Sequence, residues 1–204
     1  MRFFSKTSCL PRLLLTLTAA LPLAAAAHTG VEAHAHPAFL AGFLHPLSGV
    51  DHLAAMVSIG LWSALAARRA GPALLAGPLG FAAMLLVGAV LGMLGVQLPA
   101  VEPMIAASLL VSGLLVITRW RLSGGAAALL AGGFALFHGL AHGQELAGNM
   151  NAAFALAGML SATVLLHASG LGLGWALRRA PVWLPRAAGA GVAVFGMTLL
   201  ARLA

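Results

Sequence analysis

Apolar residues fill most of the chain in runs that are each long enough to cross a lipid bilayer. Six such runs follow the N-terminal segment, at residues 37–67, 72–95, 103–118, 126–147, 153–177 and 183–203. Roughly twenty apolar residues coiled as a helix span the hydrocarbon core of a membrane, which is about 30 Å thick. The polar positions between the runs are few and fall into short groups. The pattern therefore predicts an all-α membrane protein with six transmembrane helices.

The first run is longer than a single crossing requires. Its roughly thirty residues would form a straight helix of about 45 Å, whereas about 30 Å suffices. Pro46 and Gly49 divide the excess. We expect a short interfacial or re-entrant piece up to His45, a break, and a spanning helix over about residues 50–67. Asp51 then lies in the first turn of that helix, where a carboxylate complements the helix dipole.

Composition supports a lipid environment. Hydrophobic residues make up 61% of the 204 residues and charged residues only 7%, whereas a water-soluble domain carries about 25% charged residues. The net charge of +7 would suggest nucleic-acid binding in a soluble protein. Here the arginines fall in short clusters between apolar runs, which indicates membrane topology instead. We therefore expect lipid, and no nucleic acid, as a partner of this chain.

Basic residues recur in every other connection between the runs. They are Arg68 and Arg69, then Arg119 and Arg121, then Arg178, Arg179 and Arg186. The connections at residues 97–102 and 149–151 contain none. Because short arginine-rich loops stay on the cytoplasmic side, the alternation fits a multi-pass protein with six spans. Both ends of the mature chain then lie outside the cytoplasm.

The first 27 residues have the pattern of a secretory signal peptide. A basic start, an apolar core and a small-residue end follow one another: Arg2, Lys6 and Arg12, then residues 13–23, then residues 24–27. This order is typical of a cleaved signal, and the alternative is an uncleaved first helix. We predict residues 1–27 as signal peptide and residues 28–204 as the six-span domain. Cleavage would remove Cys9, the one cysteine of the chain, so a metal ion would need nitrogen, oxygen or thioether ligands.

Two glycine pairs with four-residue spacing lie within the runs. Gly88 and Gly92 form one pair, and Gly139 and Gly143 form the other. Small residues at this spacing let the backbones of neighbouring membrane helices approach closely. We predict that these glycines are packing positions.

Two polar segments interrupt the apolar runs. The first, residues 45–56, contains His45, Asp51, His52 and Met56, and the second, residues 137–145, contains His138, His142 and Glu145. Ionisable side chains are costly inside a membrane and usually functional there. Residues four and seven apart share one face of a helix. We therefore expect each segment to present its polar side chains together.

The predicted topology brings both polar segments to the outer half of the membrane. The first span enters from outside, so Asp51 and His52 lie at its outer end. The fourth span runs outwards, and a rise of about 1.5 Å per residue places His138 roughly 20 Å and Glu145 roughly 30 Å from its inner end. Their convergence predicts one metal site, and the alternative is that each histidine donates a hydrogen bond between helices. Imidazole and carboxylate without thiolate favour nickel, cobalt or copper(II).

Four further histidines lie outside these segments. His28, His34 and His36 follow the predicted cleavage point, where they form either a metal-collecting arm or an ordinary solvated leader. His167 lies deeper in the fifth span. It is either a second stop for an ion moving inwards or a plain hydrogen-bond donor between helices.

At the two polar segments the sequence resembles the HupE/UreJ family of nickel and cobalt permeases, which are accessory proteins of hydrogenase and urease systems. The resemblance extends to the signal peptide, the histidine at the start of the mature chain and the six-span layout. It implies transport of a divalent metal ion across the bacterial inner (cytoplasmic) membrane, with periplasmic termini. By this resemblance, the candidate ion contacts are Asp51, His52, His138, His142 and Glu145. His45 and Met56 are supporting candidates.

We therefore expect a permease for Ni²⁺, with Co²⁺ as the second candidate, that is not an enzyme and has no prosthetic group. The sequence contains no phosphate-cradling GxxxxGK[ST] loop, which argues against ATP hydrolysis by this chain. An alternative is an intramembrane metal-dependent hydrolase, with Ser48 or Ser58 near the reacting group, although no HExxH motif is present. A third possibility is a membrane metal sensor or chaperone subunit.

The arginine alternation makes topology testable. Reporter fusions after Arg69, Arg121 and Arg179 should read cytoplasmic, because each follows an arginine cluster. Fusions near Gln97, near Asn149 and after Ala204 should read periplasmic. A cytoplasmic C-terminal fusion would contradict the topology, and with it the placement of both polar segments in the outer half.

Overall fold

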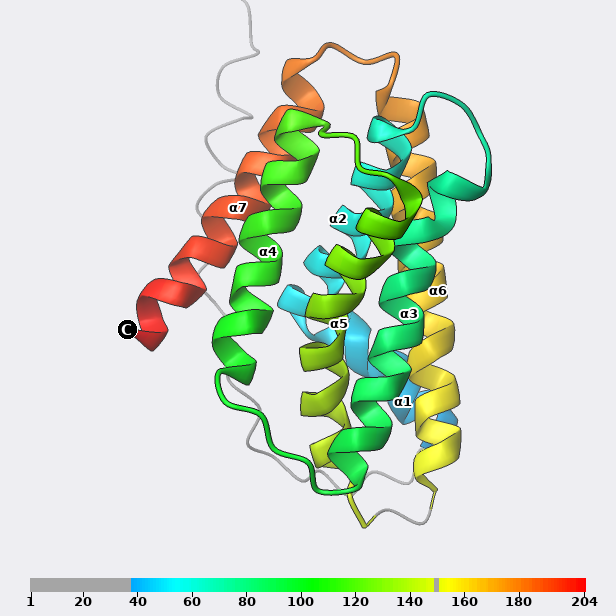
Figure 1. The fold of residues 1–204 in the computed structure, drawn as a ribbon, viewed down its shortest axis with the longest axis vertical. Helices are drawn as coiled ribbons and strands as arrows, with labels where there is room; N and C mark the ends of the chain where they lie inside the picture. The colour runs from blue at the N-terminus through cyan, green and yellow to red at the C-terminus, as the bar shows by residue number, and fades with distance from the viewer. Residues whose placement is uncertain (1–37, 149–150) are drawn as a thin grey trace, which may run out of the picture. The chain divides into compact units, whose positions relative to one another are not determined.

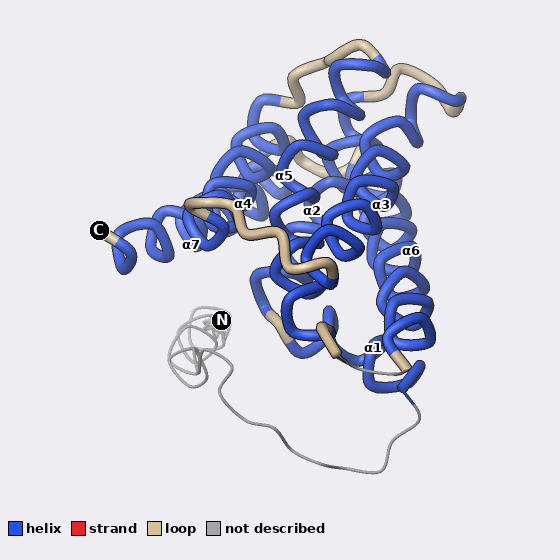
Figure 2. Tube along the Cα trace, turned by 60° about the horizontal axis from the view of Figure 1, so that its bottom comes forward, coloured by secondary structure: helices blue, strands red, loops and turns tan. Residues whose placement is uncertain are grey.

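The computed structural model describes residues 38–148 and 151–204, and within these ranges the chain consists of seven α-helices without a β-strand (Figures 1 and 2). The helices are α1 (Ala38–Ser48), α2 (Val50–Ala66), α3 (Pro72–Met93), α4 (Val101–Thr118), α5 (Gly124–Leu146), α6 (Ala152–Leu177) and α7 (Trp183–Leu203). The all-α prediction is confirmed. The predicted signal peptide, with His28, His34 and His36, lies outside the described residues.

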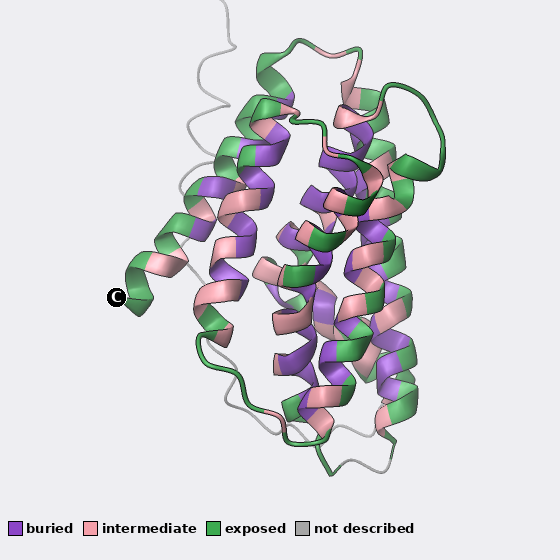
Figure 3. Ribbon diagram, in the orientation of Figure 1, coloured by how far each residue is buried: buried purple, intermediate pink, exposed green. Residues whose placement is uncertain are grey.

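Five of the described helices, α3 to α7, are long and apolar enough to cross a membrane. Helices α1 and α2 meet the same test only together, and they are bent by 79° at their junction. Figure 3 shows exposed positions along the outer faces of the helices. Large apolar side chains occupy several of them, including Leu79, Leu129 and Val164. An apolar outer surface is what a protein in lipid presents to its solvent.

The predicted break in the first run is present, but three residues later than expected. Helix α1 continues through Pro46 to Ser48, and the chain turns at Gly49. Pro46 lacks an N–H group, yet the carbonyl of His45 still accepts a bond from Gly49 N–H at 3.3 Å. Proline removes its own helical hydrogen bond but leaves the carbonyl of the preceding residue able to accept one. The helix therefore ends at the extended backbone of Gly49 and not at His45.

The three arginine-bearing connections lie at one end of the described bundle. Figure 1 shows the α2–α3, α4–α5 and α6–α7 connections at the top, and the α3–α4 connection at the bottom. The top connections carry Arg68, Arg69, Arg119, Arg121, Arg178 and Arg179. The helices from α2 to α7 thus alternate in direction as the sequence pattern predicts.

Glycines let neighbouring helices touch backbone to backbone. A Cβ atom on Gly88 of α3 would lie against the carbonyl oxygen of Leu136 in α5, and one on Gly139 of α5 would lie against that of Leu85 in α3. Gly92 and Gly143 make equivalent contacts between the same two helices. The predicted packing role of both glycine pairs is confirmed. Glycines pack α4 against α7 and α2 against α6 in the same way.

Two glycines of α6 allow this packing to be tested with a matched control. A Cβ on Gly170 would collide with the carbonyl oxygen of Val57 in α2, whereas a Cβ on Gly172 meets nothing within 4 Å. Gly170→Ala should therefore lower stability by about 1–3 kcal/mol, the usual range for overpacking. Gly172→Ala should leave stability unchanged or slightly raised, because alanine favours helix.

The measurement is the temperature at which each purified variant aggregates in detergent. Equal thermal stability of Gly170→Ala and wild type would show that α2 and α6 do not meet at this point.

Candidate metal site

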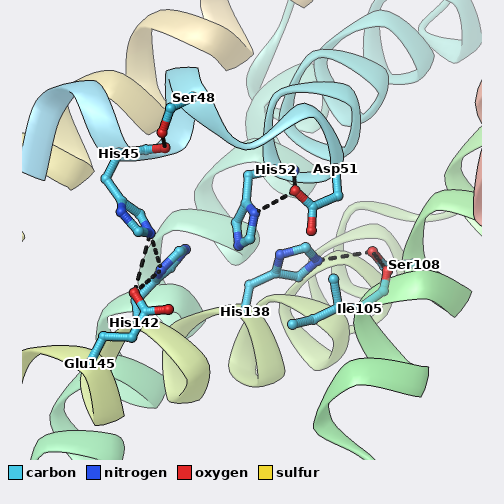
Figure 4. Close-up of polar contacts among 9 residues, drawn as sticks. All are labelled: His45, Ser48, Asp51, His52, Ile105, Ser108, His138, His142 and Glu145. Atoms are coloured by element: carbon cyan, nitrogen blue, oxygen red, sulfur yellow. Dashed lines mark hydrogen bonds and ion pairs between the residues drawn. The ribbon is translucent and has the colours of Figure 1, made fainter. Parts of the chain in front are cut away.

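The two polar segments meet where α1, α2 and α5 come together (Figure 4). His45 lies in the last turn of α1, and Asp51 lies in the first turn of α2, next to His52. His138 and His142 come from α5. The ring centroids are 4.6 Å apart for His45 and His142, 4.4 Å for His52 and His142, and 5.0 Å for His52 and His138. These distances confirm the prediction that the segments converge, and metal binding by them stays a prediction.

The bend at Gly49 places His45 and His52 on the same side of α5. A Cβ on Gly49 would lie 3.0 Å from His52 Nδ1 and 3.1 Å from Asp51 Oδ1. Such distances are tighter than ordinary van der Waals contact. A side chain at this position would therefore crowd the Asp51–His52 pair, and glycine leaves that space open.

The packing of α5 on α3 orients the other two histidines. Gly139 and Gly143 face α3, and each directly follows a histidine. Successive helical residues are about 100° apart around the axis. His138 and His142 are therefore offset from the backbone contact with α3, and both rings lie beside His52 of α2. They are 0% and 2% exposed.

Three side chains form an outer group: His45, His142 and Glu145. His45 Nε2 is 3.0 Å from His142 Nδ1 and 3.3 Å from Glu145 Oε2, and His142 Nδ1 is 3.7 Å from the same oxygen. The three ligand atoms lie within 4.8 Å of one another. The Glu145 side chain is 51% exposed and that of His142 is 3% exposed. The outer group thus runs from the surface into the interior.

Three imidazole nitrogens lie deeper, and we call them the buried nitrogens: His52 Nε2, His138 Nδ1 and His142 Nε2. Each is buried and has no hydrogen-bond partner within residues 38–148 and 151–204. Figure 4 shows the three rings facing one another. Burying a polar group without a partner costs free energy. A divalent cation beside any of these nitrogens would supply a missing partner, since neutral imidazole nitrogen is a ligand for nickel, copper, zinc and iron. The ligand atoms that lie within 4.8 Å of one another are those of the outer group.

Asp51 interacts with its neighbour in the sequence. Its Oδ1 accepts bonds from the backbone N–H of His52 at 2.9 Å and from the ring Nδ1–H of His52 at 2.9 Å. The proton on Nδ1 leaves the lone pair on Nε2, one of the buried nitrogens. Carboxylates that hold metal-binding histidines in this way fix the tautomer and the ring orientation. Asp51 is therefore placed to orient His52.

Met56 lies one turn beyond His52 along α2. It is 0% exposed and belongs to the apolar core together with Ile59 and Phe81. Its role as a supporting ligand stays a prediction.

Ser108 and Phe81 contact the histidines from other helices, and no sequence pattern pointed to either residue. Ser108 Oγ in α4 lies 2.9 Å from His138 Nε2. The Phe81 ring in α3 lies 5.6 Å from His138 and 5.1 Å from His167, centroid to centroid. A serine or phenylalanine in an apolar run is common, so its type carries little signal. The one available sign was that Ser108 and Ser112 are hydroxyls four residues apart in the otherwise apolar stretch 103–117.

His167 lies beyond Phe81. Its Nδ1–H donates to the carbonyl oxygen of Thr163 at 2.8 Å, a bond within α6, and its Nε2 is buried without a hydrogen-bond partner among the described residues. This bond lies within α6, so it is not the bond between helices that one expectation required. The role as a second stop for an ion stays a prediction.

The two serines considered for a hydrolase both donate hydrogen bonds to backbone carbonyls. Ser48 Oγ donates to the carbonyl oxygen of His45 at 2.8 Å, and Ser58 Oγ donates to that of Ala54. Neither hydroxyl bonds an imidazole in the part of the chain that the structure describes. This arrangement gives the hydrolase alternative no support.

Two spaces lie between the histidines and the arginine end. A cavity of about 10 Å³ lies there, lined by Trp62, Phe81, Ser108 and neighbouring apolar side chains, and a cavity of this size holds about one water molecule. A second pocket, of about 440 Å³, opens at the arginine end and is also lined by Trp62. Trp62 Nε1 donates to the carbonyl oxygen of Trp120 at 2.9 Å. The indole thus lies between the two spaces.

A helical bundle with an apolar outer surface, two buried imidazoles and neighbouring, partly exposed carboxylates defines a membrane protein with a candidate site for a divalent metal ion. The chain belongs to the HupE/UreJ family: residues 15–199 match the family model described as HupE / UreJ protein. It is 43% identical over 187 residues to Protein HupE of Rhizobium leguminosarum bv. viciae, covering 91% of this chain and 95% of that protein. The resemblance noted in the sequence is confirmed. No solved structure matches the chain.

Proposed function

We propose that this protein is a secondary permease that carries Ni²⁺, with Co²⁺ as the second candidate, across the bacterial inner membrane. The metal would serve hydrogenase or urease maturation. The observation that carries the proposal is the convergence of four histidines and Glu145 inside an apolar bundle, with His45 Nε2 only 3.0 Å from His142 Nδ1. Membership of the HupE/UreJ family supports it.

The proposed topology has six spans after a cleaved signal peptide of residues 1–27. The bent pair α1–α2 counts as the first span, and α3 to α7 supply the other five. Both termini of the mature chain, residues 28–204, are periplasmic. The outer group then faces the periplasm, and the arginine end faces the cytoplasm.

The ion enters at the outer group and passes to the buried nitrogens. Glu145 is half exposed and negatively charged, so it attracts a cation to the surface of the site. His142 belongs to both sets: its Nδ1 lies in the outer group and its Nε2 is one of the buried nitrogens. The cation can therefore move inwards by exchanging one nitrogen of His142 for the other. Asp51 orients His52, and Met56 supports the site from the next turn of α2.

Uptake into liposomes tests the function directly. Purified protein should carry Ni²⁺ into vesicles down its gradient without any organic substrate, and Co²⁺ should compete better than Zn²⁺. The readout is a metal-sensitive dye inside the vesicles, with protein-free vesicles as the control. A pure protein that moves no metal yet cleaves lipid or amide substrates would overturn the proposal.

Metal binding in detergent tests the site. His52→Ala and His138→Ala should each abolish most Ni²⁺ binding and uptake, because each removes one of the buried nitrogens. Replacing His28, His34 and His36 together should cost little, because an exposed arm can only raise the local ion concentration. Size-exclusion profiles should show that all variants are folded. Wild-type affinity in both single variants would leave the cluster as a set of structural contacts.

A further inference from the structure

Ser108 bonds both to the backbone of its own helix and to His138. Its Oγ lies 2.6 Å from the carbonyl oxygen of Ile105 and 2.9 Å from His138 Nε2. Ser108 is 5% exposed and His138 is 0% exposed. Both bonds are therefore sheltered from water, and neither partner can readily exchange for solvent.

A serine hydroxyl has one proton, and the carbonyl oxygen of Ile105 must receive it. Two oxygen atoms at 2.6 Å repel each other unless a hydrogen lies between them, and a carbonyl oxygen has none to give. Ser108 Oγ therefore donates to Ile105 and uses a lone pair towards His138. It follows that His138 Nε2 carries a hydrogen and donates it to Ser108.

This bond determines which nitrogen of His138 is available to a metal ion. A neutral imidazole carries one proton on its two nitrogens. With the proton on Nε2, the lone pair lies on Nδ1, which is one of the buried nitrogens. The opposite tautomer would point an N–H group at His52 and His142 and could not bind a cation there.

We propose that Ser108 is a positioning residue that fixes His138 as the Nε2–H tautomer and so prepares Nδ1 for the ion. The inference rests on the proposed function, which it extends to a residue of α4 that belongs to neither polar segment. Ser108 does for His138 what Asp51 does for His52, with a hydroxyl in place of a carboxylate. Groups of this kind typically change metal affinity by about 10- to 100-fold.

Ser112 is a matched control. It lies one turn further along α4, is 2% exposed, lines the same small cavity and donates to a carbonyl of its own helix, that of Leu109, at 3.1 Å. It has no bond to an imidazole in the ranges 38–148 and 151–204. Ser112→Ala therefore removes a buried hydroxyl without touching the histidines.

The first measurement is the tautomer of His138 in metal-free protein labelled with ¹⁵N-histidine. The His138 signals are assigned by their loss in His138→Gln. We expect Nε2 to be protonated in the wild type and in Ser112→Ala, and the proton to be shared between the two nitrogens in Ser108→Ala. A wild-type His138 protonated on Nδ1 overturns the inference, even if Ser108→Ala fails to fold.

The second measurement is the affinity of each variant for Ni²⁺ alone in detergent. We expect a loss of about 10- to 100-fold for Ser108→Ala and no loss for Ser112→Ala. Normal Ni²⁺ binding by Ser108→Ala overturns the role of Ser108 and leaves the proposed function standing. A wild type that binds no Ni²⁺ overturns the proposed function itself, while the tautomer still reports on the Ser108 bond.

Discussion

The lipid around this protein offers no hydrogen-bond partner, so each polar atom inside the bundle depends on a neighbour supplied by the protein. Two of the histidines meet this requirement at only one of their two ring nitrogens. Asp51 holds one nitrogen of His52, and Ser108 holds one nitrogen of His138. The second nitrogen of each ring is left without a partner among the described residues. A cluster that satisfies one half of each imidazole and leaves the other half open is suited to a ligand that arrives and departs.

Glycine makes this cluster possible in two ways. Gly139 and Gly143 seat α5 directly on α3, and the adjacent histidines lie beside His52 of α2. Gly49 bends the chain between α1 and α2 and leaves room for the Asp51–His52 pair. In membranes, close helix contact comes mainly from small residues and van der Waals packing, because lipid tails provide no hydrophobic driving force between helices. The geometry of the site therefore depends on glycines, which have no side chain that could bind an ion.

The sequence predicted the helices and the meeting of the two polar segments, because apolar run length and arginine alternation depend on the lipid alone. It placed the end of the first piece three residues too early, at His45, because the effect of Pro46 depends on which hydrogen bonds survive around it. Its assignment of Asp51 as a contact of the ion stays a prediction, and the fold adds that Asp51 Oδ1 bonds His52. It passed over Ser108, whose role arises only when α4 lies beside α5. The type of a residue says little about which residues it contacts on a helix far away in the sequence.

The small cavity beside Trp62 is relevant to the electrical potential across the membrane. A bacterial inner membrane holds an electrical potential worth about 2.3 kcal/mol per elementary charge for each 100 mV. An unbroken file of water through a carrier would conduct protons and short-circuit that potential. Here the interior beyond the histidines has room for about one water, and the indole of Trp62, bonded to the carbonyl of Trp120, lies between it and the arginine-side pocket. A cavity of this size does not hold a file of water, which suits a carrier that must preserve the charge gradient of the proposed inner membrane.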